Sequence, residues 1–303
     1  MIVVIGGATA TGKSSLAVEV AKHVDGEIIS ADSMQIYKGM DVGTAKATPE
    51  EQGGVPHYML DIVSPKDNFN VALYVEKVKK IIKDIEKRGK TAVIVGGTGL
   101  YIRSLLYNYE MGEYDEGLRK KLEEERAEKG DEYMWDKLSK LDPDGAAKIH
   151  KNNVKRVLRA IEVFMLTGRS VTKQDNVEEA YEHVLICLGA DRKSLYDRIE
   201  KRVDLMFERG LTDEVKRLLE EGVTFDMQSM QAIGYKEFRP YFGGEKTLEE
   251  VKEAIKLDTR HYAKRQETWF RSMPTAKWLS IDEKDDLIDK TKDIIIKKGL
   301  KWN

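Results

Sequence analysis

Residues 7–14 have the types and spacing of a loop that binds phosphate. They match the pattern GxxxxGKS and read Gly7-Ala8-Thr9-Ala10-Thr11-Gly12-Lys13-Ser14. The apolar run Ile2 to Ile5 precedes them, and a helical pattern from Leu16 to His23 follows. In this strand–loop–helix context, glycines let backbone N–H groups surround an anion, and the helix start adds its positive dipole end. We expect Lys13 to neutralise the terminal phosphate and Ser14 to bind Mg²⁺. The alternative is a glycine turn that only joins a strand to a helix.

The acidic residue that usually accompanies such a loop is not at the position expected for an enzyme of phosphoryl transfer. Enzymes of that class usually carry an acid at the end of a second apolar strand, to help hold the metal. Here the candidate strand 91–95 carries none and runs into Gly96-Gly97-Thr98-Gly99-Leu100-Tyr101. Asp32 instead follows the apolar run 27–31. At the carboxyl end of a parallel strand, a carboxylate faces the crevice where open α/β sheets bind ligands.

The elements that must position these residues alternate along the chain. Apolar strands near 2–6, 27–31, 91–95 and 183–189 alternate with helices, which predicts an α/β fold with a P-loop-type parallel sheet core flanked by helices. Residues 115–182 read as helical and predict an insertion domain, so that 1–114 and 183–303 form the core. Further candidate elements are strands at Pro56 to Val63 and Trp278 to Ile281, and helices at Arg192 to Arg209, Leu211 to Glu221, Leu248 to Arg271 and Asp282 to Lys298.

Composition limits the class of protein. The 303 residues are 41% hydrophobic and 34% charged, which fits one large or two ordinary globular domains. No apolar run approaches the ~20 residues that span a bilayer, and the chain enters a strand directly, so we expect a cytoplasmic protein without a membrane partner. Cys187 is the only cysteine, which excludes an internal disulfide and a multi-cysteine metal site. The five histidines are scattered, so no zinc site is expected.

Charge is unevenly placed, although the net charge is only −2. Between residues 148 and 173 one acid, Glu162, faces seven cations: Lys148, Lys151, Lys155, Arg156, Arg159, Arg169 and Lys173. Such a block can meet a phosphate backbone. It can equally be a solvated helix, because an apolar stripe runs through it at helical spacing: Val154, Val157, Leu158, Ile161 and Phe164.

Several motifs together resemble the tRNA dimethylallyltransferases. They run in the family's order from about residue 2 to residue 271: the phosphate loop, Asp32 to Lys46 (DSMQIYKGMDVGTAK), Gly54 to Tyr58 (GVPHY), Gly96 to Tyr101 (GGTGLY), Gln231 to Lys236 (QAIGYK) and Lys264 to Arg271 (KRQETWFR). Each motif alone is a modest signal, and the set is very specific. Ile36 and Lys38 depart mildly from the family pattern, and the chain resembles the bacterial type.

The resemblance implies a prenyl transfer. The family moves a dimethylallyl group from dimethylallyl diphosphate to N6 of the adenosine just 3′ of the anticodon, giving N6-dimethylallyladenosine and diphosphate. The phosphate loop would then hold a leaving group, which explains the missing second-strand acid. The resemblance also implies that Arg202 reaches the diphosphate and that the segment from Leu141 to Val163 engages tRNA.

The reaction needs a base and stabilisation of the leaving oxygen. The N6 lone pair is conjugated into the ring, so attack benefits from proton removal, and Asp32 is our candidate base. Its structural alternative is a cap or turn carboxylate. Lys13, Mg²⁺ on Ser14, the loop amides and the Thr98 hydroxyl would stabilise charge on the departing oxygen. The alternative for Thr98 is a plain N-cap of the following helix.

The target base is expected to be turned out of its stack, which costs little in an RNA loop. Ser33, Met34 and Gln35 lie beside Asp32, and the Gln35 amide could read an adenine edge. The remaining candidate contacts to the anticodon stem-loop are Arg119, Lys155, Arg156, Arg159, Gln231, Gly234, Tyr235, Lys236, Arg265 and Arg271. No protein partner is implied, and we expect a monomer.

Three other function classes share part of this pattern. A small-molecule kinase would share the phosphate loop but needs a lid of arginines and little RNA surface. A prenyltransferase acting on free adenine nucleotide would share Asp32 and Thr98, with less reason for the basic block. A non-catalytic RNA-binding module would need neither Lys13 nor Asp32.

Overall fold

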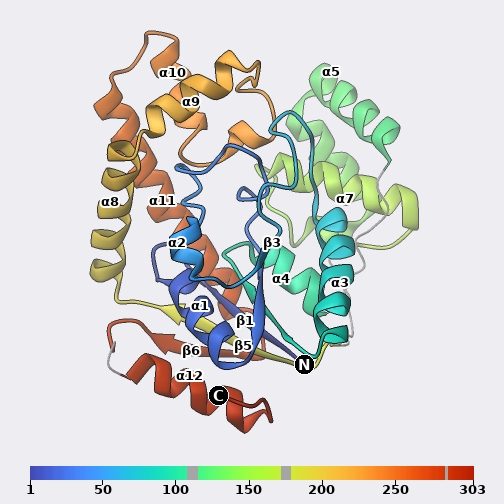
Figure 1. The fold of residues 1–303 in the computed structure, drawn as a ribbon. Helices are drawn as coiled ribbons and strands as arrows, with labels where there is room; N and C mark the ends of the chain where they lie inside the picture. Colours follow the sequence, from blue (N-terminus) through green and yellow to red (C-terminus); the bar gives the residue numbers. More distant parts are fainter. Residues whose placement is uncertain (108–114, 172–178, 284–285) are drawn as a thin grey trace. The chain divides into compact units, whose positions relative to one another are not determined.

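A six-stranded, all-parallel sheet forms the centre of the fold (Figure 1). This computed structural model describes residues 1–107, 115–171, 179–283 and 286–303. The strand order is β3-β2-β4-β1-β5-β6. The strands are β1 (Ile2–Gly7), β2 (Gly26–Ser30), β3 (His57–Tyr58), β4 (Thr91–Val95), β5 (His183–Gly189) and β6 (Ala276–Ser280). The predicted α/β class with a parallel sheet is confirmed.

The central strands are continuous apolar runs because both of their faces are covered. All six residues of β1 are buried, and β1 pairs with β4 on one side and β5 on the other. Val3 stands in register with Val93 and with Val184. Such runs are typical of parallel strands buried between two helix layers. The carboxyl ends of β1, β2 and β4 therefore meet at one edge of the sheet.

The sheet-containing part of the chain also includes several helices. They are α1 (Lys13–His23), α2 (Pro49–Gln52), α3 (Val71–Lys87), α4 (Gly99–Leu106), α8 (Arg192–Glu208), α9 (Leu211–Glu220), α10 (Arg239–Phe242), α11 (Leu248–Arg271) and α12 (Leu287–Lys297). Two 3-10 turns, η1 (Ser229–Gln231) and η2 (Lys236–Phe238), lie between α9 and α10.

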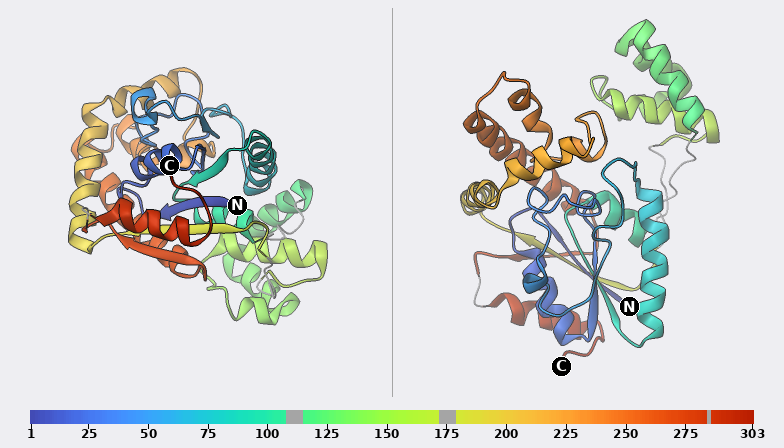
Figure 2. Two further views of the ribbon diagram at one scale, coloured as in Figure 1. Left: turned by 60° about the horizontal axis from the view of Figure 1, so that its bottom comes forward. Right: turned by 45° about the horizontal axis from the view of Figure 1, so that its top comes forward.

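Helices α1 and α12 share one face of the sheet, as the views of Figure 2 show. Leu16 of α1 and Ile295 of α12 belong to the same buried cluster as Val3 and Ile5 of β1. Helix α11 covers the opposite face, where Gly6 of β1 meets the Phe270 ring. A Cβ at Gly6 would lie 2.4 Å from a ring carbon, so only glycine fits there.

Two sequence-based boundaries change. The candidate strand from Pro56 to Val63 shortens to β3, because Met59 and Asp61 adopt positive φ and end it. The helix expected from Asp282 to Lys298 is seen as α12, and residues 284–285 lie outside the described part of the chain. Helix α11 spans the predicted residues, and the predicted late strand is present as β6, which begins two residues before Trp278 and ends one residue before Ile281.

Contacts divide the chain into two units, Met1–Tyr107 with Ala180–Asn303 and Asn108–Glu179. The second unit contains α5 (Glu116–Leu141), α6 (Pro143–Ala146) and α7 (Val154–Thr167). Helix α5 bends at Gly130, whose φ of 85° is left-handed. The α7 stripe packs with α5, and its central members, Val157, Leu158 and Ile161, are buried as predicted.

A buried carboxylate ties β2 to its neighbours. Glu27 accepts hydrogen bonds from the Tyr58 hydroxyl at 2.8 Å and from both Arg88 amino groups, one of them at 2.7 Å. The Arg88 hydrogen bonds, with smaller help from Tyr58 and Lys90, lower the pKa of Glu27 to about 2. Its ordinary pKa is 4.5, so ionised Glu27 stabilises the fold above about pH 4.5, and this contribution is lost as the pH falls through about 2.

We therefore predict that Glu27→Gln destabilises the protein by about 2 kcal/mol at neutral pH, because charge-assisted hydrogen bonds are lost. The difference from the wild-type protein should shrink between about pH 4.5 and pH 2, where Glu27 itself becomes neutral. Urea unfolding at a series of pH values measures this difference. A difference that stays constant over that range would show that the charge of Glu27 does not stabilise the fold.

Candidate active site

The phosphate loop wraps tightly between β1 and α1. Gly7 has a φ of 128°, and a Cβ there would lie 2.4 Å from the Leu188 carbonyl oxygen. Gly12 precedes α1 with a φ of 80°, also left-handed. The buried Thr11 hydroxyl donates to the Ala8 carbonyl at 2.8 Å and closes the loop. Ser14 is exposed in the first turn of α1, where a hydroxyl can meet a phosphate-bound cation.

A side chain distant in sequence fixes this loop against the turn that follows β4. Gln266 of α11 is buried, and its Oε1 accepts from the Thr9 amide at 2.9 Å. Its Nε2 donates to the Gly97 carbonyl at 2.9 Å. One carboxamide thus joins the loop after β1 to the loop after β4.

Two cations, Lys13 and Arg202, share the space beside the loop. Burial, and then the charge of Arg202, lower the pKa of Lys13 to about 7, while Asp32 and Cys187 act in the opposite direction. Burial also lowers the pKa of Arg202. Neither cation forms an ion pair within 4.0 Å with a carboxylate of the described residues. Two confined cations that repel each other make a site for a multiply charged anion.

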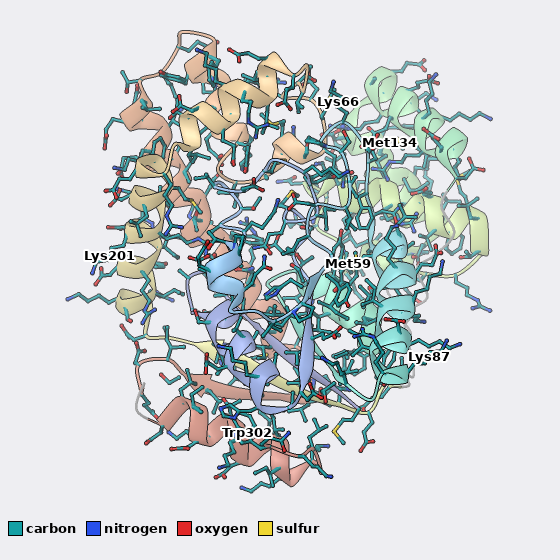
Figure 3. All side chains as sticks on the ribbon, viewed as in Figure 1. Met59, Lys66, Lys87, Met134, Lys201 and Trp302 are labelled. Atoms are coloured by element: carbon teal, nitrogen blue, oxygen red, sulfur yellow. The ribbon has the colours of Figure 1, made fainter. Side chains whose placement is uncertain are left out.

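Arg202 is directed inward from α8, a helix with one exposed and one buried face. Its guanidinium donates to the Thr44 carbonyl at 3.4 Å. The neighbouring residue Lys201 is exposed and extends away from α8 in Figure 3. Because successive residues of a helix point in different directions, Lys201 is solvated while Arg202 enters the site.

Asp32 follows β2, and its two carboxylate oxygens differ in their contacts. Its Oδ1 accepts from the amides of Met34 at 2.8 Å and Gln35 at 3.3 Å, as in a turn carboxylate. Its Oδ2 accepts no hydrogen bond from the described residues. One oxygen orients the carboxylate, and the other is available to a ligand.

Thr98 occupies the N-cap position of α4, yet its side chain makes no cap hydrogen bond. Its hydroxyl accepts from the Ser33 amide at 3.0 Å and lies 3.4 Å from the Ser33 hydroxyl. Thr98 therefore holds the segment after Asp32 against the loop after β4, which a plain N-cap would not do.

Two cavities adjoin at these residues. The smaller, of about 80 Å³, is lined by Lys13, Ser14, Gln35 and Gln266 among others. The larger, of about 310 Å³, is lined by polar residues and by apolar side chains such as Met34, Met206 and Ile255. Four residues line both cavities: Thr9, Asp32, Arg202 and Tyr262. A reaction between ligands of the two cavities would occur beside Asp32.

The structure brings many of the expected residues to the larger cavity. Its lining includes Asp32, Ser33, Met34, Arg202, Gln231, Gly234, Lys236 and Arg265. The Gln35 amide is engaged internally, with Ser30 at 3.0 Å and the carbonyls of Thr44 and Ala45 at 3.3 and 3.5 Å. Gln35 therefore forms part of the wall of the smaller cavity.

Other expected residues lie elsewhere. Tyr235 is fully buried, and Arg271 lies over the Trp278 ring, 4.9 Å from its centroid. In the unit that contains α5–α7, Lys155 and Arg156 are exposed. Arg119 and Arg159 instead pair with the buried Glu162 at 3.5 and 2.9 Å. Lys173 lies outside the described residues.

Sequence reasoning missed one face of α11. Ile255, Thr259 and Tyr262 line the larger cavity, and Gln266 lines the smaller one. Their spacings of four, three and four residues place them on one side of a helix, which was the available signal. Burial, followed by the charge of Asp32, raises the pKa of Tyr262 to about 12, so its hydroxyl stays protonated at neutral pH.

The fold and the site define an α/β protein with an anion cradle at the carboxyl edge of a parallel sheet. The sequence model of the family described as IPP transferase matches residues 35–273. A tRNA dimethylallyltransferase of Acetivibrio thermocellus is 51% identical over 290 residues, which are 94% of this chain and 93% of that protein. One of Bacillus cytotoxicus is 48% identical over 307 residues, covering 100% and 97%.

Solved structures of tRNA-modifying transferases are also similar to this chain. The tRNA isopentenylpyrophosphate transferase of Bacillus halodurans aligns with a TM-score of 0.75 and 44% identity, covering 98% of this chain and 96% of that one. A eukaryotic dimethylallyltransferase acting on tRNA aligns with a TM-score of 0.84 and 29% identity, covering 98% and 78%. This chain belongs to the tRNA dimethylallyltransferase family.

We predict that Gln266→Ala weakens pyrophosphate binding by about thirtyfold, because the loss of two buried hydrogen bonds of about 1 kcal/mol each frees the phosphate loop. Calorimetric titration with pyrophosphate measures the affinity. Gln52→Ala, which removes a glutamine outside both cavities, is the control and should bind as the wild-type protein does. Unchanged affinity in Gln266→Ala would show that the loop holds its conformation without this bridge.

Proposed function

We propose that this chain transfers a dimethylallyl group from dimethylallyl diphosphate to N6 of the adenosine 3′-adjacent to the anticodon in tRNA. The observation that carries the proposal is the adjoining pair of cavities with Asp32 in their shared wall. The smaller cavity suits a diphosphate and the larger suits a base. Family membership supports the same reaction.

In this proposal the diphosphate lies in the cradle of residues 7–14. The amides of Gly7 to Ser14 and the dipole of α1 face its oxygens, and Lys13 and Arg202 neutralise its charge. The donor set fits Mg²⁺, since Ser14 offers an exposed hydroxyl and the ion otherwise prefers phosphate oxygens and water. When bound there, Mg²⁺ would neutralise charge on the departing diphosphate.

The chemical step is a direct displacement. The N6 nitrogen forms a bond to the allylic carbon as the carbon–oxygen bond to the diphosphate breaks, and that electron pair stays on the departing oxygen. The N6 proton passes to the available oxygen of Asp32, while the Met34 and Gln35 amides hold the other oxygen. Burial raises the pKa of Cys187 to about 12, so its thiol is no candidate for a covalent intermediate.

The base pocket is built around Ser33 and Met34, which line the larger cavity. Thr98 holds Ser33 in place, and we propose that its hydroxyl stabilises charge on the departing group. Gln35 lies in the wall of the smaller cavity, where its amide donates to the Thr44 carbonyl. We propose that Gln231, Gly234, Lys236 and Arg265 bound the same pocket. Tyr235 supports it from the interior, and Arg271 meets RNA at the end of α11.

We further propose that residues 115–182 form the insertion domain that meets the anticodon stem. Lys155 and Arg156 are its exposed cations at the start of α7, where they can contact phosphates. Arg119 serves this surface through its ion pair with Glu162, which joins α5 to α7. Arg159 pairs with the same carboxylate from within α7. No helix among the described residues could cross a membrane. We place the enzyme in the cytoplasm as a monomer.

Labelled dimethylallyl diphosphate tests the reaction when it is offered with tRNA, with AMP and with neither acceptor. We expect label in tRNA at the adenosine 3′ of the anticodon. Label in AMP alone would identify a prenyltransferase of free nucleotides. If no prenyl transfer occurs, transfer of phosphate from labelled ATP in a parallel assay would identify a kinase.

Asp32→Asn is predicted to lower the single-turnover rate by about 10²-fold or more, since the amide cannot accept the N6 proton. Pyrophosphate and tRNA affinities should remain close to the wild-type values, because Oδ1 of the asparagine can still accept the Met34 amide. Rapid quench at saturating substrates measures the rate. Near-normal turnover would remove Asp32 from the mechanism.

Reversal of Lys155 and Arg156 to Glu is predicted to weaken tRNA binding and to lower the slope of log K against log salt by about one unit for each lost phosphate contact. Arg159 is left intact because its reversal would place two carboxylates beside each other in α7. The control reverses Lys79 and Lys83, exposed cations of α3. If both double variants gave the same slope of log K against log salt, the α7 cations would be shown to form an ordinary solvated surface.

A further inference from the structure

The loop between β2 and α2 turns around a carboxylate from a distant helix. The amides of Asp41, Val42 and Gly43 converge on Glu214 of α9, at 2.8, 2.8 and 3.1 Å. Glu214 is buried. Three successive N–H groups aimed at one anion form a concave nest, so the loop adopts its shape around this side chain.

Tyr235 completes the anchor. Its hydroxyl donates to Glu214 at 2.6 Å, and burial together with the nearby carboxylate raises its pKa, so it remains a donor. Its ring lies directly against Gly43, where a Cβ would be 2.5 Å from ring carbons. No lysine or arginine of the described chain pairs with Glu214 within 4.0 Å. Four hydrogen bonds therefore balance its charge, and the loss of any exposes a buried polar group.

The residues just beyond this anchor enter the candidate active site. The Thr44 carbonyl accepts from Arg202 at 3.4 Å and from Gln35 at 3.3 Å. Gly43 and Thr44 line the larger cavity, and Ala45 lines the smaller one. The loop thus contributes to the walls of both cavities.

Residues 41–45 have few other ties to the rest of the chain. Their remaining hydrogen bonds stay within the loop, such as Thr44 Oγ1 to the Met40 carbonyl at 2.6 Å. Other parts of the loop are held by neighbouring segments, as Ser33 is by Thr98 and Lys46 by Asp61. Arg217, also on α9, holds the preceding Gly39 carbonyl at 2.6 Å. Arg202 has no carboxylate partner within 4.0 Å among the described residues, and its guanidinium donates a hydrogen bond to the Thr44 carbonyl.

We propose that Glu214 is a positioning residue for the diphosphate site: it holds residues 41–45 so that the Thr44 carbonyl directs Arg202 toward the bound diphosphate. The inference rests on the diphosphate site of the proposed function. Glu214 touches neither substrate, and its effect reaches the anion only through the loop and Arg202.

A double-mutant cycle on pyrophosphate binding tests this route. The substitution Glu214→Gln retains the shape of the side chain but turns an N–H donor toward groups that are themselves all donors. We therefore expect pyrophosphate to bind about tenfold more weakly. In an Arg202→Gln background the same substitution should change the affinity by less than about twofold, because the group on which it acts is already gone. Glu220→Gln, at an exposed position of α9, is the matched control and should leave both affinities unchanged.

Tyr235→Phe provides a second variant, because it removes one donor and keeps the carboxylate. It should weaken pyrophosphate binding less than Glu214→Gln does and should show the same dependence on Arg202. Thermal unfolding confirms that each variant is folded, and the tyrosine variant carries the cycle if Glu214→Gln does not fold.

The inference is overturned if Glu214→Gln or Tyr235→Phe weakens pyrophosphate binding equally with and without Arg202. It is also overturned if neither substitution changes the affinity for pyrophosphate. A wild-type protein that fails to bind pyrophosphate would instead remove the diphosphate site itself, and with it the proposed function. The two failures are therefore distinguishable without any measurement of prenyl transfer.

Discussion

The Gln266 carboxamide joins two loops that parallel strands bring to one edge of the sheet but do not connect. Its hydrogen bonds to the Thr9 amide and the Gly97 carbonyl fix the phosphate loop against the turn after β4. Thr98 in that turn then holds Ser33 in the loop after β2. These contacts fix how the two cavities, the two cations and Asp32 are arranged, because each loop alone could adopt several conformations.

Electrostatics explains why the site suits a leaving diphosphate. Lys13 and Arg202 repel each other and lack carboxylate partners among the described residues, so a bound polyanion relieves an unfavourable arrangement. Asp32 lies at the border of this positive region, with one oxygen fixed by two amides. In the proposed mechanism, a base at Asp32 beside a cation-rich leaving-group site allows proton removal and bond breaking to proceed together without a nucleophile from the protein.

The fold and the phosphate loop could be predicted from sequence because their signals are local. Apolar runs, the glycine spacing and the Lys13–Ser14 pair each depend on neighbours within a few residues. The roles of Thr98 and Asp32 stayed open because the decisive partners, Ser33 for Thr98 and the adjoining cavities for Asp32, come from tertiary packing. Arg119 and Arg159 look like free cations in sequence, yet packing pairs both with Glu162. Gln266 bridges to a residue 257 positions away, which no local pattern reveals.

Initial-rate kinetics with both substrates varied tests whether the dimethylallyl group passes directly between two occupied cavities. Direct transfer predicts intersecting lines in double-reciprocal plots, with no prenylated protein when dimethylallyl diphosphate is supplied without tRNA. Parallel lines, or a dimethylallyl group trapped covalently on the protein in the absence of tRNA, would contradict it.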